Sequence, residues 1–263
     1  IKYVRNFDPD ILVGYGTNGQ DWPYLLSRSK KLGINLSVDR TKTEPHRSIF
    51  GHVSVTGRAN IDFFDFAEDF PEVKVKTLEN VADFLGVMKL EKRKIIEDVD
   101  FPTYWQSPEK RPLLLKFSKE NTQCVMGIAD AMLDFAMQLS NLVGLPLDYV
   151  GTAAVGFRVE WFLIRRAYKI GELIPERVER PYFPYVGAIV LEPKPGVHEN
   201  IAVLDFKAMY PNIMITQNVS PDTYISSTEP EPPSGVNVAP EVNHRFRVEP
   251  PGFYKRVLSH LID

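Results

Sequence analysis

The sequence has little cysteine, little net charge and no long apolar run, and each shortage excludes a class of protein. Cys124 is the one cysteine in 263 residues, so an internal disulfide is impossible and a reducing, cytoplasmic compartment is expected. The net charge of −3 excludes a general coat of basic residues, but it leaves room for a local nucleic-acid surface. No apolar run approaches the roughly 18 residues of a membrane helix, so no membrane association is expected.

The common short catalytic motifs are also missing. The sequence contains no CxxC, no GxxxxGK[ST] and no HExxH, and its five histidines lack metal-ligand spacing. The chain opens on Ile1, its first methionine is Met88, and it ends within an amphipathic pattern that has no cap. We therefore expect a piece of a longer protein.

Hydrophobic periodicity predicts a mixed α/β chain with a helical middle. Apolar residues at alternating spacings of three and four predict a long helix over 118–143, which Gly144 ends. A buried strand precedes a glycine-rich turn and a helix, and period-two alternation around Thr56 predicts a hairpin. The other expected elements are helices over 21–32, 78–85 and 152–170, and strands over 11–15, 52–56, 60–66, 187–191 and 200–206.

A carboxylate stands at the end of the last of these strands. Asp205 follows the apolar run Ile201–Leu204 and precedes a helical pattern. The carboxyl ends of strands are where α/β folds hold ligands, and a carboxylate there suits a hard divalent cation. By itself, an Asp in this place is more often a helix cap.

The longer string DFKAMYPNIMITQNVSPDT, which begins at Asp205, resembles the first polymerase motif of family B DNA polymerases, and its second half resembles the archaeal members. The resemblance implies that Asp205 and the backbone carbonyl of Phe206 bind catalytic metal ions, and that Tyr210 stacks under the incoming sugar and excludes ribonucleotides. Ala208, Met209 and Asn212 depart from the family pattern. The implied nucleotide-binding segment is Phe206, Lys207, Ala208, Met209 and Tyr210.

Other segments resemble the same family in the same order. The string around Tyr185 and Gly187 is similar to a family motif that guides DNA between polymerase and proofreading sites. The helix that contains Arg165 resembles the one that joins the exonuclease and palm domains. The implied domains are a partial RNase H-like 3′–5′ exonuclease domain over 1–132, connecting helices over 133–175 and the first part of the polymerase palm over 176–263.

The resemblance implies a DNA-directed DNA polymerase that adds dNTPs to a primer by a two-metal mechanism. Two Mg²⁺ ions would activate the primer 3′ hydroxyl and neutralise the leaving pyrophosphate. The expected partners are primer–template DNA and dNTPs, at the nucleoid, and a sliding clamp would bind through segments outside this chain. This chain lacks the later catalytic motifs, so we expect it to be inactive alone.

The proofreading motifs depart from the family pattern. In the second motif Asp21 is kept as a residual metal ligand, but Gly16 replaces Asn and Gln20 replaces Phe. In the third motif Phe117 replaces the tyrosine that orients water, and Asn121 replaces the metal-binding Asp. A neutral amide lacks the charge that holds a divalent ion, so we expect proofreading to be lost or strongly weakened.

Two alternatives remain open at this stage. A catalytically inactive paralogue of the polymerase could act as a DNA-binding or scaffolding subunit, which the altered exonuclease motifs favour and the intact Asp205 and Tyr210 oppose. A free-standing RNase H-like nuclease is disfavoured by Gly16 and Asn121.

Overall fold

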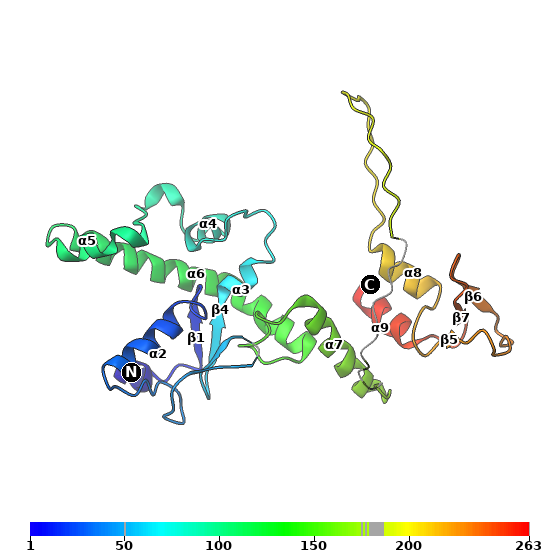
Figure 1. The fold of residues 1–263 in the computed structure, drawn as a ribbon, viewed down its shortest axis with the longest axis horizontal. Helices are drawn as coiled ribbons and strands as arrows, with labels where there is room; N and C mark the ends of the chain where they lie inside the picture. The colour runs from blue at the N-terminus through cyan, green and yellow to red at the C-terminus, as the bar shows by residue number, and fades with distance from the viewer. Residues whose placement is uncertain (50, 175, 177, 179–186, 263) are drawn as a thin grey trace. The chain divides into compact units, whose positions relative to one another are not determined.

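The computed structural model describes residues 1–49, 51–174, 176, 178 and 187–262. The chain divides into two compact units, Ile1–Arg165 and Arg166–Asp263, and each is described by itself. Helices and short strands alternate in both units (Figure 1), which confirms the mixed α/β class predicted from the sequence.

The first unit begins with a small parallel pair of strands flanked by helices. Strands β1 and β4 pair in parallel with Leu12 opposite Asn60, and a separate antiparallel pair joins β2 to β3. The predicted strand and helix after Asp10 are confirmed. The elements are α1 (Lys2–Phe7), β1 (Ile11–Gly14), α2 (Asp21–Lys31), β2 (His46–Arg47), β3 (Val53–Ser54), β4 (Ala59–Asp62) and α3 (Phe63–Ala67).

The predicted strand over 60–66 is wrong in its second half. It ends at Asp62, whose side chain accepts a hydrogen bond from the backbone N–H of Phe64 and so caps α3. Phe63 and Phe66 then lie on one side of a short helix and pack in the main core. The expected turn at Thr56 remains as a single antiparallel bridge between Val55 and Arg58.

A 33-residue helix, α6 (Arg111–Val143), organises the rest of the first unit. Helices α4 and α5 pack against it, as Figure 1 shows, and its buried face closes the core over β1 and α3. It begins earlier than predicted because Pro112 suits a first helical turn, and Gly144 ends it at φ 86° as expected. The remaining elements are α4 (Leu78–Phe84), η1 (Leu90–Lys92), η2 (Asp98–Asp100) and α5 (Phe101–Gln106).

Helix α7 (Val155–Ile170) contains the division between the units, and the second unit continues with two helices and a small sheet. Helix α8 packs against α9, and the antiparallel sheet has the order β5-β7-β6. The elements are α8 (Met209–Thr216), β5 (Tyr224–Ile225), β6 (Val236–Val238), β7 (Arg245–Arg247) and α9 (Phe253–Ile262).

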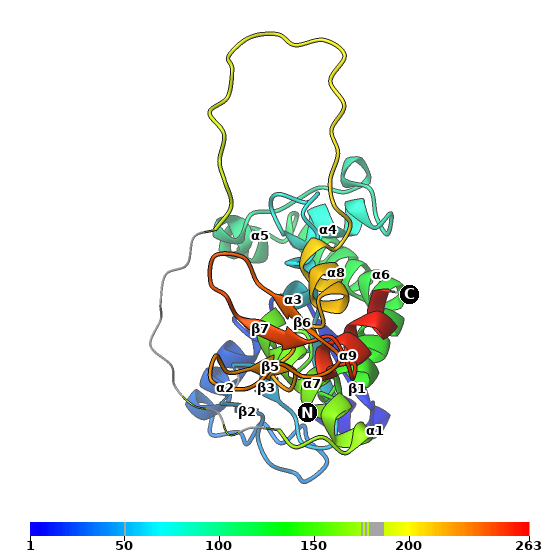
Figure 2. The same ribbon diagram turned by 90° about the vertical axis from the view of Figure 1, so that its right-hand side faces the viewer.

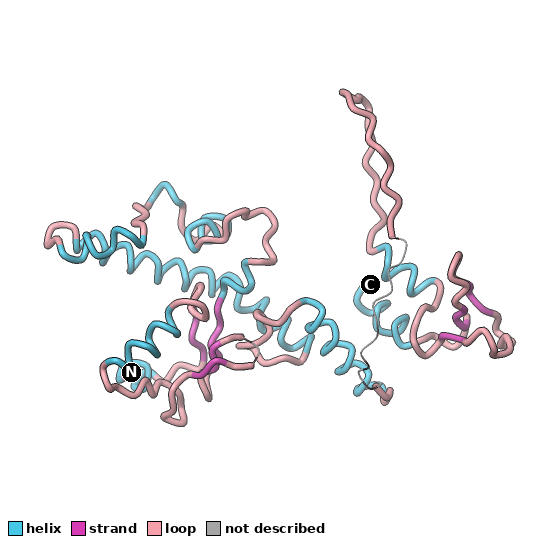
Figure 3. The backbone as a smooth tube through the Cα atoms, in the orientation of Figure 1, coloured by secondary structure: helices cyan, strands magenta, loops and turns pink. Residues whose placement is uncertain are grey.

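The strands predicted over 187–191 and 200–206 do not form. Figures 2 and 3 show residues 187–206 as an open loop without strands. Val190 is 90% exposed and Leu204 is 92% exposed, so no other described segment covers this apolar run. The apolar pattern was correctly recognised, but a strand is stable only when a neighbouring strand accepts its backbone hydrogen bonds.

Candidate functional site

Residues 205–210 lie at the N-terminal end of α8. Asp205 and Phe206 are exposed in the loop that leads into the helix. Ala208 occupies the N-cap position of the helix with φ 49°, and the side chain of Asn212 donates a hydrogen bond to the backbone carbonyl of Lys207 at 2.7 Å. This bond holds the turn that joins Asp205 to the helix.

The same turn borders a shallow cavity of about 350 Å³ in the second unit. The side chain of Tyr210 is not among its lining residues and is 74% exposed. The N–H groups of the first helical turn have no partner within a helix and favour an anion. The cavity is lined by Phe206, Lys207, Met209, Asn212, Ile213, Thr216 and Gln217.

The other end of α8 is held by a buried amide. Asn218 is 1% exposed, and its Nδ2 donates to the carbonyls of Arg247, Val248 and Pro250 at 2.7, 3.3 and 3.0 Å. Its Oδ1 accepts the backbone N–H of Gly252 at 2.8 Å. One side chain therefore ties the end of α8 to the segment between β7 and α9.

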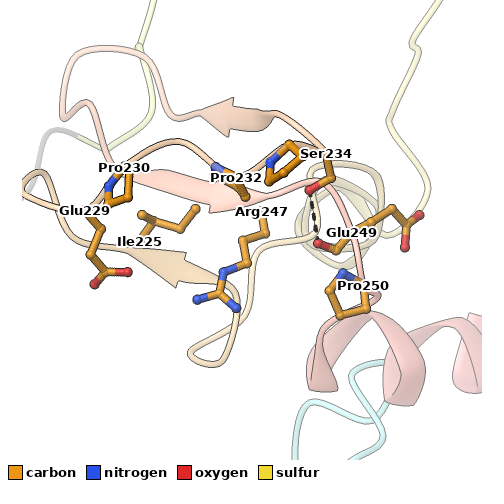
Figure 4. Close-up of a pocket in the computed structure, with 9 residues that line it drawn as sticks. Ile225, Glu229, Pro230, Pro232, Ser234, Arg247, Glu249 and Pro250 are labelled. Atoms are coloured by element: carbon orange, nitrogen blue, oxygen red, sulfur yellow. Dashed lines mark hydrogen bonds between the residues drawn. The ribbon is translucent and has the colours of Figure 1, made fainter.

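A second cavity of about 430 Å³ lies beside the small sheet, and Figure 4 shows its lining. Prolines of the loop between β5 and β6 form one wall, and Ser234 in that loop donates a hydrogen bond to the carbonyl of Glu249 at 3.3 Å. Arg247 and Ile225 also line the cavity. None of the site residues predicted from the sequence lines it.

In the first unit, Asp62 organises the loop that carries the altered second exonuclease motif. Its carboxylate accepts the backbone N–H groups of Gly16 at 2.6 Å and Asn18 at 2.8 Å. Gly16 has φ 73°, a conformation in which glycine is unstrained. Gln20 occupies the N-cap position of α2 without a capping side-chain hydrogen bond, and Asp21 begins the helix, so the motif is a strand–loop–helix corner.

Three carboxylates gather at this corner. Burial, reinforced by the charge of Asp62, raises the pKa of Asp65 to about 6. The same two causes raise the pKa of Asp21. Asn18 donates a side-chain hydrogen bond to Asp65 at 3.3 Å. The sequence reasoning missed Asp62 and Asp65, although the alternation that ends in two carboxylates after residue 60 carried the signal.

The residues predicted as the third exonuclease motif lie on α6, and their side-chain contacts do not include the three carboxylates near Gly16. Phe117 is buried, and the side chain of Asn121 accepts a hydrogen bond from Arg93. No hydrogen bond or ion pair within the described residues joins Asp21 to Asn121. Sequence reasoning also missed Arg93, which comes from the irregular connection before α5.

The remaining predicted positions are not brought to either site. Gly187 is exposed in the open loop, and Tyr185 lies outside the described residues. Among the residues the structure describes, no group of three His, Cys, Asp or Glu side chains is arranged to hold a metal ion. No helix in the described part of the chain is both long and apolar enough to cross a membrane.

Comparison with known proteins finds one family along both units. The profile described as DNA polymerase family B, exonuclease domain, matches residues 1–81, and that of DNA polymerase family B matches residues 145–259. The whole chain is 52% identical to part of DNA polymerase 2 of Aeropyrum pernix, covering 33% of that protein. It is 41% identical to part of a DNA polymerase of Archaeoglobus fulgidus, covering 32% of it.

A solved structure shows the same fold. The family B DNA polymerase of the hyperthermophilic archaeon Pyrobaculum calidifontis superposes on the entire chain with a TM-score of 0.87 and 53% sequence identity. The match covers 34% of that polymerase. The chain thus spans about a third of the length of the relatives it matches.

Proposed function

Because the chain belongs to DNA polymerase family B, we propose that it is the part of a DNA-directed DNA polymerase that joins an altered proofreading unit to the start of the polymerase site. The observation that carries this proposal is the motif at α8, in which Asp205 and Tyr210 are kept and are exposed at the helix entrance. We further propose the domain limits 1–132, 133–175 and 176–263.

The donor set at the α8 turn suits a hard cation. Asp205 offers a carboxylate and Phe206 a backbone carbonyl, which are the oxygen ligands that Mg²⁺ prefers. Two such ions would activate the primer 3′ hydroxyl and neutralise the leaving pyrophosphate. Asp205 supplies one carboxylate, so the other ligands would come from residues outside this chain.

The chain's own groups would bind and orient the nucleotide. The free N–H groups at the start of α8 attract the triphosphate of a dNTP, and Lys207 adds a positive charge at the same turn. The exposed ring of Tyr210 would stack under the sugar and leave no space for a ribose 2′ hydroxyl. Asn212 keeps the turn in place through the carbonyl of Lys207.

We propose that proofreading is lost or strongly weakened in this protein. Asn121 is neutral and Phe117 has no hydroxyl, so the third motif lacks both the charge that holds a metal ion and the hydroxyl that orients the attacking water. The carboxylate that remains from the second and third exonuclease motifs is Asp21, and burial and the charge of Asp62 raise its pKa.

Primer extension by the full-length protein tests the proposal. We expect magnesium-dependent addition of dNTPs to a DNA primer, and we expect no shortening of a labelled primer when dNTPs are omitted. A folded protein that binds primer–template DNA but extends nothing would instead be a scaffolding paralogue. Magnesium-dependent 3′–5′ shortening would show that proofreading survives.

A further inference from the structure

A buried arginine lies against the face of α6 where the third exonuclease motif stands. The side chain of Arg93 is 1% exposed, and its guanidinium lies 5.1 Å from the centre of the Phe117 ring. Its Nη2 donates to Oδ1 of Asn121, and its Nη1 donates to Sγ of Cys124 at 3.1 Å. Two positions that depart from the family pattern, Phe117 and Asn121, are therefore both in contact with the same cation.

The charges around Arg93 disfavour the binding of a second cation. Among the described residues, Arg93 has one ion-pair partner, Glu120, with 4.0 Å between Oε2 and Nε. Glu120 is shared with Lys116, whose ammonium lies 3.7 Å from its Oε1. Arg93 Nε is buried without a hydrogen-bond partner in the described structure. A divalent ion at Asn121 would meet a like charge at close range and gain only a neutral amide oxygen.

The aromatic residues around Arg93 also favour a buried cation at this position. The face of Phe117 attracts the guanidinium through its ring electrons, and Phe101 packs against Phe117 with 6.0 Å between ring centres. Because residue 117 is phenylalanine and not tyrosine, no hydroxyl lies at this contact, which remains apolar. A metal ion needs several oxygen ligands, and the oxygens near this position are already engaged by cations: the amide oxygen of Asn121 by Arg93, and the carboxylate of Glu120 by Arg93 and Lys116.

We infer that Arg93 is a fixed internal cation that takes the place of a metal ion at the Phe117–Asn121 face of α6, so that restoring a carboxylate at position 121 does not restore metal binding. The inference rests on the proposed assignment of Phe117 and Asn121 as exonuclease positions. The new carboxylate would pair with Arg93, because an Arg–carboxylate ion pair, with both partners charged, is stronger than the present bond from the guanidinium to a neutral amide oxygen.

The test uses the full-length protein and Mn²⁺ as the probe. Three variants are compared with the unaltered protein: Asn121→Asp, Arg93→Gln and the two combined. The numbers of bound Mn²⁺ ions are measured from the electron paramagnetic resonance of the free ion. We expect Asn121→Asp to bind the same number as the unaltered protein, and the combined variant to bind one more, weakly. An additional Mn²⁺ ion in Asn121→Asp, or none in the combined variant, would overturn the inference.

A local measurement keeps the inference testable if the combined variant fails to fold. Asn121→Asp should slow amide hydrogen exchange in residues 117–125 by about threefold or more without any metal, because its carboxylate is tied to Arg93. Gln123→Glu adds the same charge to the exposed side of α6 and is the control, with exchange unchanged. Faster exchange in Asn121→Asp would also overturn the inference.

Primer shortening by the unaltered protein would contradict the proposed loss of proofreading instead, and the two failures are therefore distinguishable.

Discussion

The two regions that resemble catalytic motifs differ in what their side chains contact. At the Phe117–Asn121 face of α6, Phe117 is buried and Asn121 is half-buried, and both side chains contact Arg93. At the entrance of α8, Asp205 and Tyr210 are exposed, and no hydrogen bond or ion pair within the described residues engages their side chains. A site that uses its polar groups internally has none to offer a ligand, whereas exposed groups on a fixed turn remain available.

The two regions also differ in how they are supported. The α8 turn is exposed at its front, but Asn218 holds the far end of the helix with four hydrogen bonds. The α6 face is held directly by the residues that resemble catalytic ones. At the α8 turn, the residue that supports the helix, Asn218, is therefore distinct from Asp205 and Tyr210, the residues with a proposed catalytic role. The predictions below test this separation.

The largest effect is expected from Asp205→Asn. The variant keeps the shape of the side chain but removes the charge that would hold a divalent cation, so primer extension should fall by at least about 1,000-fold. Because Asp205 is exposed, folding should be unchanged. Glu199→Gln, which removes an exposed carboxylate from the same loop, is the matched control and should extend primers normally. Equal activity of the two variants would contradict the proposed role of Asp205.

The next largest effect is expected from Asn218→Ala. Loss of the amide leaves three carbonyls and one N–H without their partner, and φ 52° suits alanine poorly, so the local stability of α8 and α9 should fall by about 3 kcal/mol. Hydrogen exchange of residues 209–223 in the full-length protein measures this loss. Asn212→Ala, which removes a single exposed hydrogen bond, should cost less than about 1 kcal/mol.

A smaller effect is expected from Tyr210→Ala. Removing the exposed ring should open space for a ribose and raise ribonucleotide incorporation relative to dNTP incorporation by about tenfold to a hundredfold. Tyr210→Phe retains the ring and should keep the selectivity of the unaltered protein. Single-nucleotide extension with matched dNTP and rNTP substrates gives the ratio. Relaxed selectivity in the phenylalanine variant would assign the role to the hydroxyl.

Local patterns predicted the elements whose signals are contained within a few residues. The helix predicted over 78–85 forms as α4, with Thr77 as a cap that accepts the N–H of Asn80 at 3.3 Å, and Gly144 ends α6 as predicted. The apolar run around Val190 also has a clear pattern, but strand formation depends on a partner strand that the run itself does not specify.

The contacts that define the two candidate sites were harder to predict. The motif at Asp205 was recognisable as a string, but the φ of 49° at Ala208 was not. Arg93 reaches Asn121 across 28 positions of the chain, from a segment without periodicity. Nothing local distinguishes Arg93 from its basic neighbours, and only the packing of the connection against α6 selects it.

The smallest effect concerns the carboxylates near Gly16 and tests how crowded that corner is. Burial and the charge of Asp62 raise the pKa of Asp65 from 3.8 to about 6. The folded chain therefore holds a proton that the unfolded chain has released, and the stability linked to this proton is fully present below about pH 4 and is lost as the pH rises through about 6.

Asp65→Asn removes the ionisation, so at pH 7.5 it should stabilise the α3 region by about 1 kcal/mol, a value that allows for partial solvent screening. At pH 4 it should have little effect. Hydrogen exchange of residues 59–67, corrected for the pH dependence of intrinsic exchange, measures the difference. Asp130→Asn, on the exposed side of α6, is the control. An equal gain at both pH values would mean that burial and the charge of Asp62 do not raise the pKa of Asp65 in the folded chain.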